Sequence, residues 1–277
     1  MAQELRDNDP FYKNWHDLIS PETLAVNEET LTKSYGKFVC QPLERGFATT
    51  IGNSLRRIML SSIRGAAITA VRLNDALHEF TTIEGVHEDV SDIILNLKQV
   101  RVKLHTPEQR TVRLEKKGPC EVTAADINGA GVVEVMNPDQ HICTITGDVS
   151  LKAELTVEWG KGYVTAELNK KEDQPIGVIP LDAAFSPIVR MQYTVGQARV
   201  GQQTDYDRLT LEIETDGSVG PRNALAYAAK ILKEQMTIFI NFDEEIAKAP
   251  VRNDGELDSN NYPAEVEIGR ASCRERV

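Results

Sequence analysis

The stretch Pro42-Leu-Glu-Arg-Gly-Phe47, with Gly52-Asn-Ser-Leu-Arg-Arg-Ile58 shortly after it, marks where the chain changes from strand to helix periodicity. From Phe47 onward, residues recur at three- and four-residue spacing on what would be one face of a helix. The members of this face are Phe47, Ile51, Leu55, Ile58, Met59 and Ser62. The pattern predicts an amphipathic helix bracketed by Gly46 and Gly65.

Two adjacent arginines, Arg56 and Arg57, lie on this predicted helix. At about 100° per residue, Arg57 falls roughly opposite the apolar face, whereas Arg56 falls nearer its edge. One interpretation is a pair of solvated surface side chains. The other is a guanidinium fork that binds carboxylates of a partner protein, a contact that arginine makes well at interfaces. Phosphate binding is a weaker interpretation, because the acidic chain supplies no supporting basic patch.

Gly52 inside the same helix requires a reason, because an interior glycine costs about 1 kcal/mol relative to alanine. Close approach of another backbone, such as the same helix of a second subunit, would supply that reason. A helix that starts only at Asn53 is the alternative.

Composition bounds the class of protein. A chain of 277 residues with 41% hydrophobic residues can bury a sizeable core and is long enough for one large domain or two small ones. The formal net charge of -11 argues against broad electrostatic binding to a nucleic-acid backbone, which requires clustered lysines and arginines. The N-terminus lacks a secretory signal pattern, and no apolar stretch approaches membrane-spanning length. We therefore expect a soluble, cytoplasmic protein.

Strand periodicity dominates the segment after the first helix. Short runs rich in Val, Ile and Thr alternate with polar residues and end at Asn, Gly or Pro turns. These runs cover residues 67–73, 100–105, 111–115, 121–125 and 132–136, and the strictest alternation covers 151–159. Further strands are predicted at 35–41, 190–195 and 209–213, with a second amphipathic helix over 84–98.

A long helix is predicted near the end of the patterned part of the chain. It begins at Pro221, which suits the first helical position because its missing N–H would have no partner inside the helix. Its apolar stripe consists of Leu225, Ala229, Leu232, Met236 and Phe239. This stripe is wide enough to pack against a partner chain or against a sheet of the same chain.

No catalytic or metal-binding pattern accompanies these elements. The four cysteines (Cys40, Cys120, Cys143 and Cys273) form no CxxC pair, so free thiols in a reducing cytoplasm are expected. The acidic residues around His87 lack metal-ligand spacing and are interpreted as a charged outer face of the second helix. Asp205-Tyr-Asp207 alone cannot hold two metal ions, and the remaining histidines (His16, His78, His105 and His141) are interpreted as structural or surface residues. Together these absences favour a binding or assembly protein over an enzyme.

Several sequence blocks, found in order between residues 30 and 242, resemble the family of bacterial DNA-directed RNA polymerase alpha subunits. They are the two stretches quoted above, Glu84-Gly-Val-His-Glu-Asp89, Ile93-Ile-Leu-Asn-Leu-Lys98, Val122-Thr-Ala-Ala-Asp126, Pro175-Ile-Gly177 and Phe185-Ser-Pro187. Independent blocks in one order make a chance match improbable.

The resemblance implies an α+β fold with two parts. One is a dimerisation domain with two long helices and a sheet, formed by residues 30–65 and 180–242, and the other is an inserted mostly-β domain over 66–179. Residues 1–29 are expected to be an N-terminal lead-in and residues 243–266 a flexible acidic linker. Residues 267–277 look like a translated sequencing adapter, so we expect them to be foreign to the fold.

The resemblance also implies the functional residues. A homodimer interface is implied at Phe47, Ile51, Gly52, Leu55, Leu225, Leu232, Met236 and Phe239. Contact with the beta subunit is implied at Arg57, with Arg56 beside it. Contact with the large subunits, mainly beta-prime, is implied at Lys98, Pro175, Ile176, Gly177, Phe185, Ser186 and Pro187.

By the same resemblance, the chain is a non-catalytic assembly subunit that homodimerises and scaffolds beta and beta-prime, with omega and sigma in the full enzyme. Nucleotidyl transfer, and with it Mg²⁺ and zinc, is implied for the large subunits, and no cofactor is implied for this chain. The family's C-terminal DNA-binding domain does not follow the linker, so direct contacts with DNA and activators are not expected. The alternatives are a free-standing homodimeric transcription regulator and a small-molecule enzyme with an unrecognised site.

Overall fold

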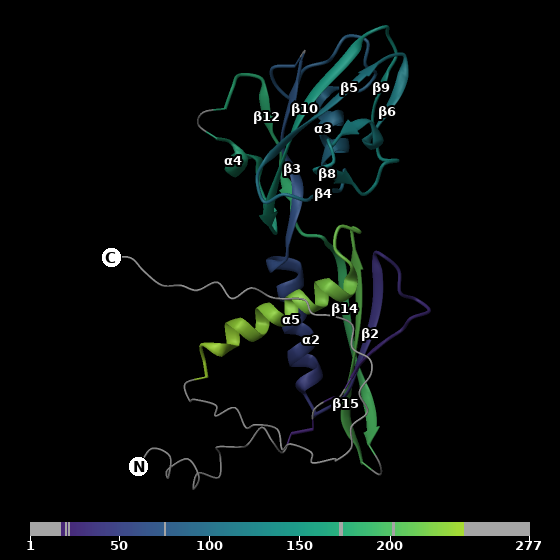
Figure 1. The fold of residues 1–277 in the computed structure, drawn as a ribbon, viewed down its shortest axis with the longest axis vertical. Helices are drawn as coiled ribbons and strands as arrows, with labels where there is room; N and C mark the ends of the chain where they lie inside the picture. Colours follow the sequence, from purple (N-terminus) through teal and green to yellow (C-terminus); the bar gives the residue numbers. More distant parts are fainter. Residues whose placement is uncertain are drawn as a thin grey trace, which may run out of the picture. The chain divides into compact units, whose positions relative to one another are not determined.

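A computed structural model of the chain describes residues 18–240, except 20, 22, 75, 172–173 and 201–202. This part of the chain mixes helices with strands and is mostly strand, as Figure 1 shows, which confirms the predicted α+β class in this broad sense. The predicted linker, the predicted foreign tail and most of the predicted lead-in lie outside the described residues. No described helix is long and apolar enough to cross a membrane.

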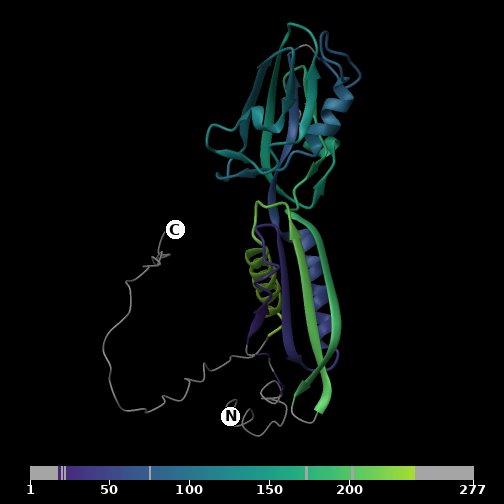
Figure 2. The ribbon, with the colours of Figure 1, turned by 90° about the vertical axis from the view of Figure 1, so that its right-hand side faces the viewer.

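Four antiparallel strands in the order β1-β2-β15-β14 form one sheet, and two helices pack on one face of it (Figure 2). The two central strands, β2 and β15, come from opposite ends of the described chain and pair directly. We call these elements the helical region. Their bounds are β1 Leu24–Val26, β2 Tyr35–Leu43, α2 Phe47–Ser62, β14 Ile188–Val200, β15 Gln203–Thr215 and α5 Pro221–Thr237.

The helices of this region form where the sequence predicts them, because each has an apolar face to bury against the sheet. The buried residues of α2 are Ala48, Gly52, Leu55 and Met59. α5 begins at Pro221, as predicted, and buries residues only in its first half. One hydrophobic core joins both helices to Phe38, Leu43, Met191, Leu209, Leu211 and Ile213 of the sheet.

A second sheet contains seven strands, in the order β7-β5-β10-β3-β4-β8, with β12 paired to β3. We call the elements from β3 to β13 the strand-rich region. The bounds of its strands are β3 Arg64–Leu73, β4 Val102–Leu104, β5 Arg110–Lys117, β6 Cys120–Thr123, β7 Ile127–Asn128, β8 Val133–Val135, β9 His141–Ile145, β10 Ser150–Lys161, β11 Tyr163–Val164, β12 Val178–Pro180 and β13 Ala183–Ala184. Its helices are α3 Val90–Lys98, the 3-10 helix Ala124–Asp126 and α4 Ala166–Asn169.

The strand-rich region has a hydrophobic core of its own, separate from that of the helical region. The strict alternation predicted for residues 151–159 is confirmed in β10, where Leu151, Ala153, Leu155 and Val157 all enter this core. α3 also contributes to this core, through Val90, Ile93, Ile94 and Leu97. The region therefore encloses its apolar strand face with its own elements.

The helix predicted over residues 84–98 is wrong at its start, because α3 begins only at Val90. Gly85 adopts a positive φ of 81°, which interrupts helical backbone. The His87 amide then donates to the Thr144 carbonyl at 3.0 Å, so this segment is a loop held against β9. β9 itself was not predicted, since Ile142 and Cys143 are both buried and break the strand alternation.

Candidate functional site

The two arginines of α2 project from the exposed side of the helix, while Leu55 and Met59 face the core of the helical region. Among the described residues, neither Arg56 nor Arg57 has a side-chain hydrogen bond or ion pair. Their guanidinium groups are thus available to carboxylates of another molecule, which is what the role predicted for Arg57 requires.

The residues predicted for the dimer interface separate into two groups. Those with exposed or half-exposed side chains are Phe47, Ile51, Leu232, Met236 and Phe239. Those buried within this chain are Gly52, Leu55 and Leu225. Only the first group presents surface that a second subunit could cover, whereas the second group fastens the helices to their own sheet.

The contact that explains Gly52 lies inside the chain, which corrects the prediction that a second subunit's helix requires this glycine. α2 includes Gly52 well within its span, so the alternative start at Asn53 is also wrong. A Cβ at this position would lie 2.8 Å from the Tyr193 ring and 3.0 Å from a Leu209 methyl group. Only glycine lets α2 approach β14 and β15 this closely.

The end of α5 and the residue after it carry large apolar side chains that the described residues leave exposed. Figure 1 shows this helix crossing α2 and continuing beyond it, away from the sheet. Met236 in the last turn is 52% exposed, and Ile238 directly after the helix is 83% exposed, while Tyr227 in the first half is also more than half exposed. Contiguous exposed apolar residues at this density mark an interaction surface more often than a solvated helix face.

Lys98 is engaged within the chain. Its Nζ donates to Asp182 Oδ2 at 2.7 Å, and the Ala166 amide donates to the other oxygen of the same carboxylate at 2.8 Å. The hydrogen bond from Lys98, followed by that from Ala166, lowers the pKa of Asp182. An outside carboxylate could therefore bind Lys98 only by sharing it with Asp182 or by displacing Asp182.

Residues predicted to face the large subunits along 175–187 are not all on the surface. Pro175 and Ile176 are exposed, Ile176 by 88%, and Gly177 and Ser186 are half-buried. Phe185 and Pro187 are buried, which corrects the prediction that they contact a partner. Phe185 instead packs so closely on Gly160 that a Cβ there would lie 2.5 Å from its ring.

An apolar groove of about 340 Å³ lies next to the exposed segment at Pro175 and was not predicted from the sequence. Its walls include Leu77 and Phe80, exposed by 72% and 81%, together with Val178 and Pro180 of β12. Leu77 and Phe80 follow the turn at Asn74. Large apolar side chains in a turn could have indicated an exposed surface for binding another protein.

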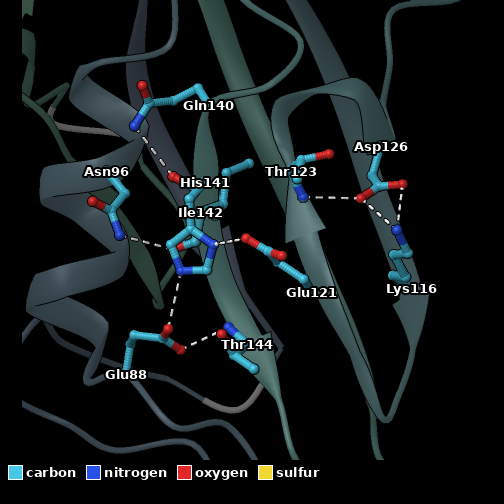
Figure 3. A network of polar contacts seen from close by, with 10 residues as sticks. All are labelled: Glu88, Asn96, Lys116, Glu121, Thr123, Asp126, Gln140, His141, Ile142 and Thr144. Atoms are coloured by element: carbon cyan, nitrogen blue, oxygen red, sulfur yellow. Dashed lines mark hydrogen bonds and ion pairs between the residues drawn. The ribbon is translucent and has the colours of Figure 1, made fainter.

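His141 is held between two carboxylates, which fits its interpretation as a structural or surface residue and adds partners that the sequence did not indicate. Figure 3 shows Glu88 and Glu121 on opposite sides of the ring. Nε2 lies 3.1 Å from Glu88 Oε1, and Nδ1 lies 2.9 Å from Glu121 Oε1. The hydrogen bond to Glu88 raises the pKa of His141 most, partial burial opposes the rise, and the bond to Glu121 adds to it.

Glu88 connects this histidine to the backbone of β9. Its other oxygen accepts a hydrogen bond from the Thr144 amide at 2.7 Å. Partial burial disfavours the carboxylate, but the bonds from Thr144 and His141 outweigh it and lower the pKa of Glu88. Glu88 therefore holds the loop before α3 against β9. The interpretation that it lies on an outer helix face is wrong.

The same part of the strand-rich region contains a second ion pair. Lys116 Nζ lies 2.7 Å from both carboxylate oxygens of Asp126, and the Thr123 amide donates to one of them at 3.0 Å (Figure 3). These contacts cap a 3-10 helix and are structural. Across the described residues, no group of three or more His, Cys, Asp or Glu side chains has an arrangement that could hold a metal ion.

Comparison of the amino-acid sequence with known proteins identifies a family to which this chain is similar. The profile of the family described as "RNA polymerase Rpb3/RpoA insert domain" matches residues 71–186. A protein of Desulfotalea psychrophila named "DNA-directed RNA polymerase subunit alpha" is 62% identical over 244 residues, which cover 88% of this chain and 71% of that protein. Proteins of the same name from Pelobacter propionicus and Geobacter metallireducens are 56% and 57% identical, over 90% and 86% of this chain and 74% and 70% of their own lengths.

Proposed function

The chain belongs to the family of DNA-directed RNA polymerase alpha subunits, and on this premise we propose that it is a non-catalytic assembly subunit of that polymerase. The single observation that carries the proposal is the similarity to named alpha subunits along nearly the whole described chain. A free-standing transcription regulator is set aside, because the matched relatives are named as polymerase subunits.

The proposal divides the chain into a dimerisation domain over residues 30–65 and 180–242 and an inserted domain over 66–179. Two separate hydrophobic cores support this division. The match of the insert-domain profile to residues 71–186 also supports it, with boundaries that differ by several residues.

A second alpha subunit is the proposed partner of the helical region. The exposed members of the predicted interface are Phe47, Met236 and Phe239, and the half-buried members are Ile51 and Leu232. Burial of apolar area contributes about 25 cal/mol per Å², so covering the exposed apolar side chains at the end of α5 would drive association. Gly52, Leu55 and Leu225 are proposed to act indirectly, by holding α2 and α5 in place.

The beta subunit is the proposed partner of Arg57, with Arg56 beside it. Both are exposed, and among the described residues neither has an internal partner to give up. An arginine fork forms two parallel hydrogen bonds with one carboxylate, which suits it to recognise an acidic partner.

The beta-prime subunit is the proposed partner of the surface at Pro175, Ile176 and Gly177, with Lys98 and Ser186. The exposed Ile176 and the neighbouring apolar groove support a protein contact there. Phe185 and Pro187 are not proposed as contacts, since they are buried.

Catalysis is proposed to reside in the large subunits, which would also hold Mg²⁺ and zinc, with omega and sigma completing the enzyme. This chain would then act in nucleotidyl transfer only as part of the complex, in the cytoplasm. Direct contacts with DNA or activators form no part of the proposal.

A capture experiment tests the proposal. Tagged wild-type chain would be co-expressed with the beta and beta-prime subunits of a closely similar polymerase, and light scattering would give its mass. We expect a wild-type dimer that captures beta, and an Arg57→Ala variant that stays dimeric but captures at least about tenfold less beta. Arg113→Ala is the control, because this arginine is exposed on the strand-rich region.

The possible outcomes test the assembly function, the role of Arg57 and the α5 interface separately. Wild-type chain that captures neither large subunit would overturn the assembly function. Full capture by Arg57→Ala would overturn only the role of that residue. A Leu232→Glu variant that remains dimeric would remove α5 from the interface.

A further inference from the structure

The start of α2 has no cap of its own. The residue before the helix is Gly46, which adopts a left-handed φ of 90° and has no side chain with which to accept a hydrogen bond. The first helical turn contains no acidic residue. The first N–H groups of a helix have no partners inside it, so a helix without a capping side chain frays at this end.

A carboxylate from the far end of the chain occupies this position. Asp207 Oδ2 accepts a hydrogen bond from the Gly46 amide at 2.8 Å, across a sequence separation of 161 residues. A negative charge near the first turn of a helix also interacts favourably with the helix dipole. Asp207 therefore fixes the residue that precedes α2 and places a negative charge near the first turn, although it does not bond the N–H groups of that turn.

An irregularity in the sheet brings Asp207 to this point. β15 pairs with β2 through Asp207 opposite Leu43 and Leu209 opposite Cys40, so the register shifts between the two pairs. Leu43 ends β2, and the chain turns immediately afterward into Gly46. The shift thus places the Asp207 carboxylate beside the turn that precedes α2.

A second contact fastens the same helix one and a half turns later. Gly52 rests on Tyr193 and on Leu209, the next inward-facing residue of β15 after Asp207. Between these two points lie Phe47, which is 44% exposed, and the half-buried Ile51. The direction in which these two apolar side chains point depends on how the first turn is held.

We propose that Asp207 is a positioning residue for alpha-subunit dimerisation, which holds the first turn of α2 so that Phe47 and Ile51 meet the second subunit. The inference rests on the proposed dimer and adds to it a residue that lies outside the predicted interface. Asp207 acts through the Gly46 amide and makes no contact with the partner in this scheme.

The effect on dimerisation separates this role from a merely structural one. A single hydrogen bond to a half-exposed acceptor adds only about 1 kcal/mol to folding, so the subunit itself remains folded without it. The dimer, in contrast, needs a defined direction of Phe47, because apolar contacts at an interface depend on close packing.

The test compares Asp207→Ala with Asp207→Asn and with Asp205→Ala. Asn retains an oxygen that can accept the Gly46 N–H. Asp205 has an exposed carboxylate two residues earlier on the same strand, so its removal matches the change in charge. The full chain would be used, and the dimer dissociation constant would be measured by sedimentation equilibrium well below the unfolding temperature.

We expect Asp207→Ala to raise the dimer dissociation constant about tenfold, while Asp207→Asn and Asp205→Ala stay within about twofold of wild type. Hydrogen exchange should accelerate at residues 46–50 in Asp207→Ala alone. An unchanged dissociation constant in Asp207→Ala, with a dimeric wild type, would overturn this inference and leave the proposed function standing. An equal loss in Asp207→Asn would overturn the acceptor role, and a monomeric wild type would overturn the proposed dimer itself.

Discussion

The two regions of the molecule treat their apolar residues differently. The strand-rich region closes its core with its own elements, so that β10 buries Leu155 and Val157 completely. The helical region buries residues only in the first half of α5 and leaves Met236 near its end, and Ile238 just after it, largely exposed. Among the described residues of the strand-rich region, the three most exposed large apolar side chains that lie outside its helices and strands are Leu77, Phe80 and Ile176, whereas others, such as Leu168 in α4, lie on short elements.

The difference shows which region leaves apolar surface for another molecule to cover. The strand-rich region buries its core residues with its own elements, so its core needs no partner to cover it. A helix that is regular, long and uncovered is stable as a helix only when something packs on its apolar side. Covering the helical region would therefore bury the exposed end of a helix. In the strand-rich region it would bury only local exposed side chains beside a closed core.

The largest effect is expected from opening the closed core. Leu155→Ala would remove a side chain with 0% exposure from the strand-rich region, and a cavity of this kind costs about 2–5 kcal/mol of unfolding free energy. Urea unfolding followed by circular dichroism measures the change. Leu168→Ala, which alters a side chain that is 78% exposed, is the control and should cost at most about 0.5 kcal/mol. Similar costs for both variants would contradict the closed core.

An intermediate effect is expected where α2 meets its sheet. Gly52→Ala would place a methyl group 2.8 Å from the Tyr193 ring, and overpacking costs about 1–3 kcal/mol. The gain in helix propensity offsets about 1 kcal/mol of this, so we expect a net loss of about 1 kcal/mol in urea unfolding. Replacing the ring in a Gly52→Ala, Tyr193→Leu double variant should recover part of the loss. A stabilised single variant would show that the contact is loose.

The smallest effect is a pH dependence in the strand-rich region. The pKa of His141 is raised in the folded protein above its ordinary 6.5, first by Glu88 and also by Glu121. Folding therefore favours the protonated ring, and its stabilisation is complete below pH 6.5 and lost as the pH rises through the folded-state pKa. Because the side chain is 37% exposed, we expect less than about 1 kcal/mol.

Urea unfolding at pH 5.5 and pH 8.5 measures this contribution. Wild type should lose more stability between these two values than His141→Gln, which keeps a polar side chain of similar size but cannot be charged. The lowered pKa of Glu88 acts at a lower pH, where that carboxylate takes up its proton, so it does not affect this window. Equal pH dependence in both proteins would contradict the assigned ion pairs.

Local periodicity predicted much of the fold. α2 was predicted at the bounds at which it occurs, and β10 and the start of α5 were predicted closely. Each of these elements buries one regular face, so its sequence repeats with the period of its backbone. The prediction failed for residues 84–89, where contacts with β9 and the conformation of Gly85 override a helix-like apolar pattern.

The candidate site was predictable in part. Sequence alone indicated that Arg57 would lie opposite the apolar face of its helix, and the exposure of this residue in the structure fits that placement. Sequence could not indicate that Phe185 is buried or that Lys98 is paired with Asp182, because both depend on segments that meet only after folding. The apolar groove beside Leu77 was missed for the same reason.

By itself, the sequence determined the order and type of the main elements, the apolar face of α2 and the family, since these depend on local spacing and on motifs. Only the tertiary structure decided that Gly52 packs on Tyr193, that His141 bonds to Glu88 across 53 residues, and that Asp207 accepts from the Gly46 amide across 161 residues. The physical reason is that such contacts depend on strand register and on the packing of distant segments. Strand register and long-range packing do not produce a repeating pattern in the local sequence.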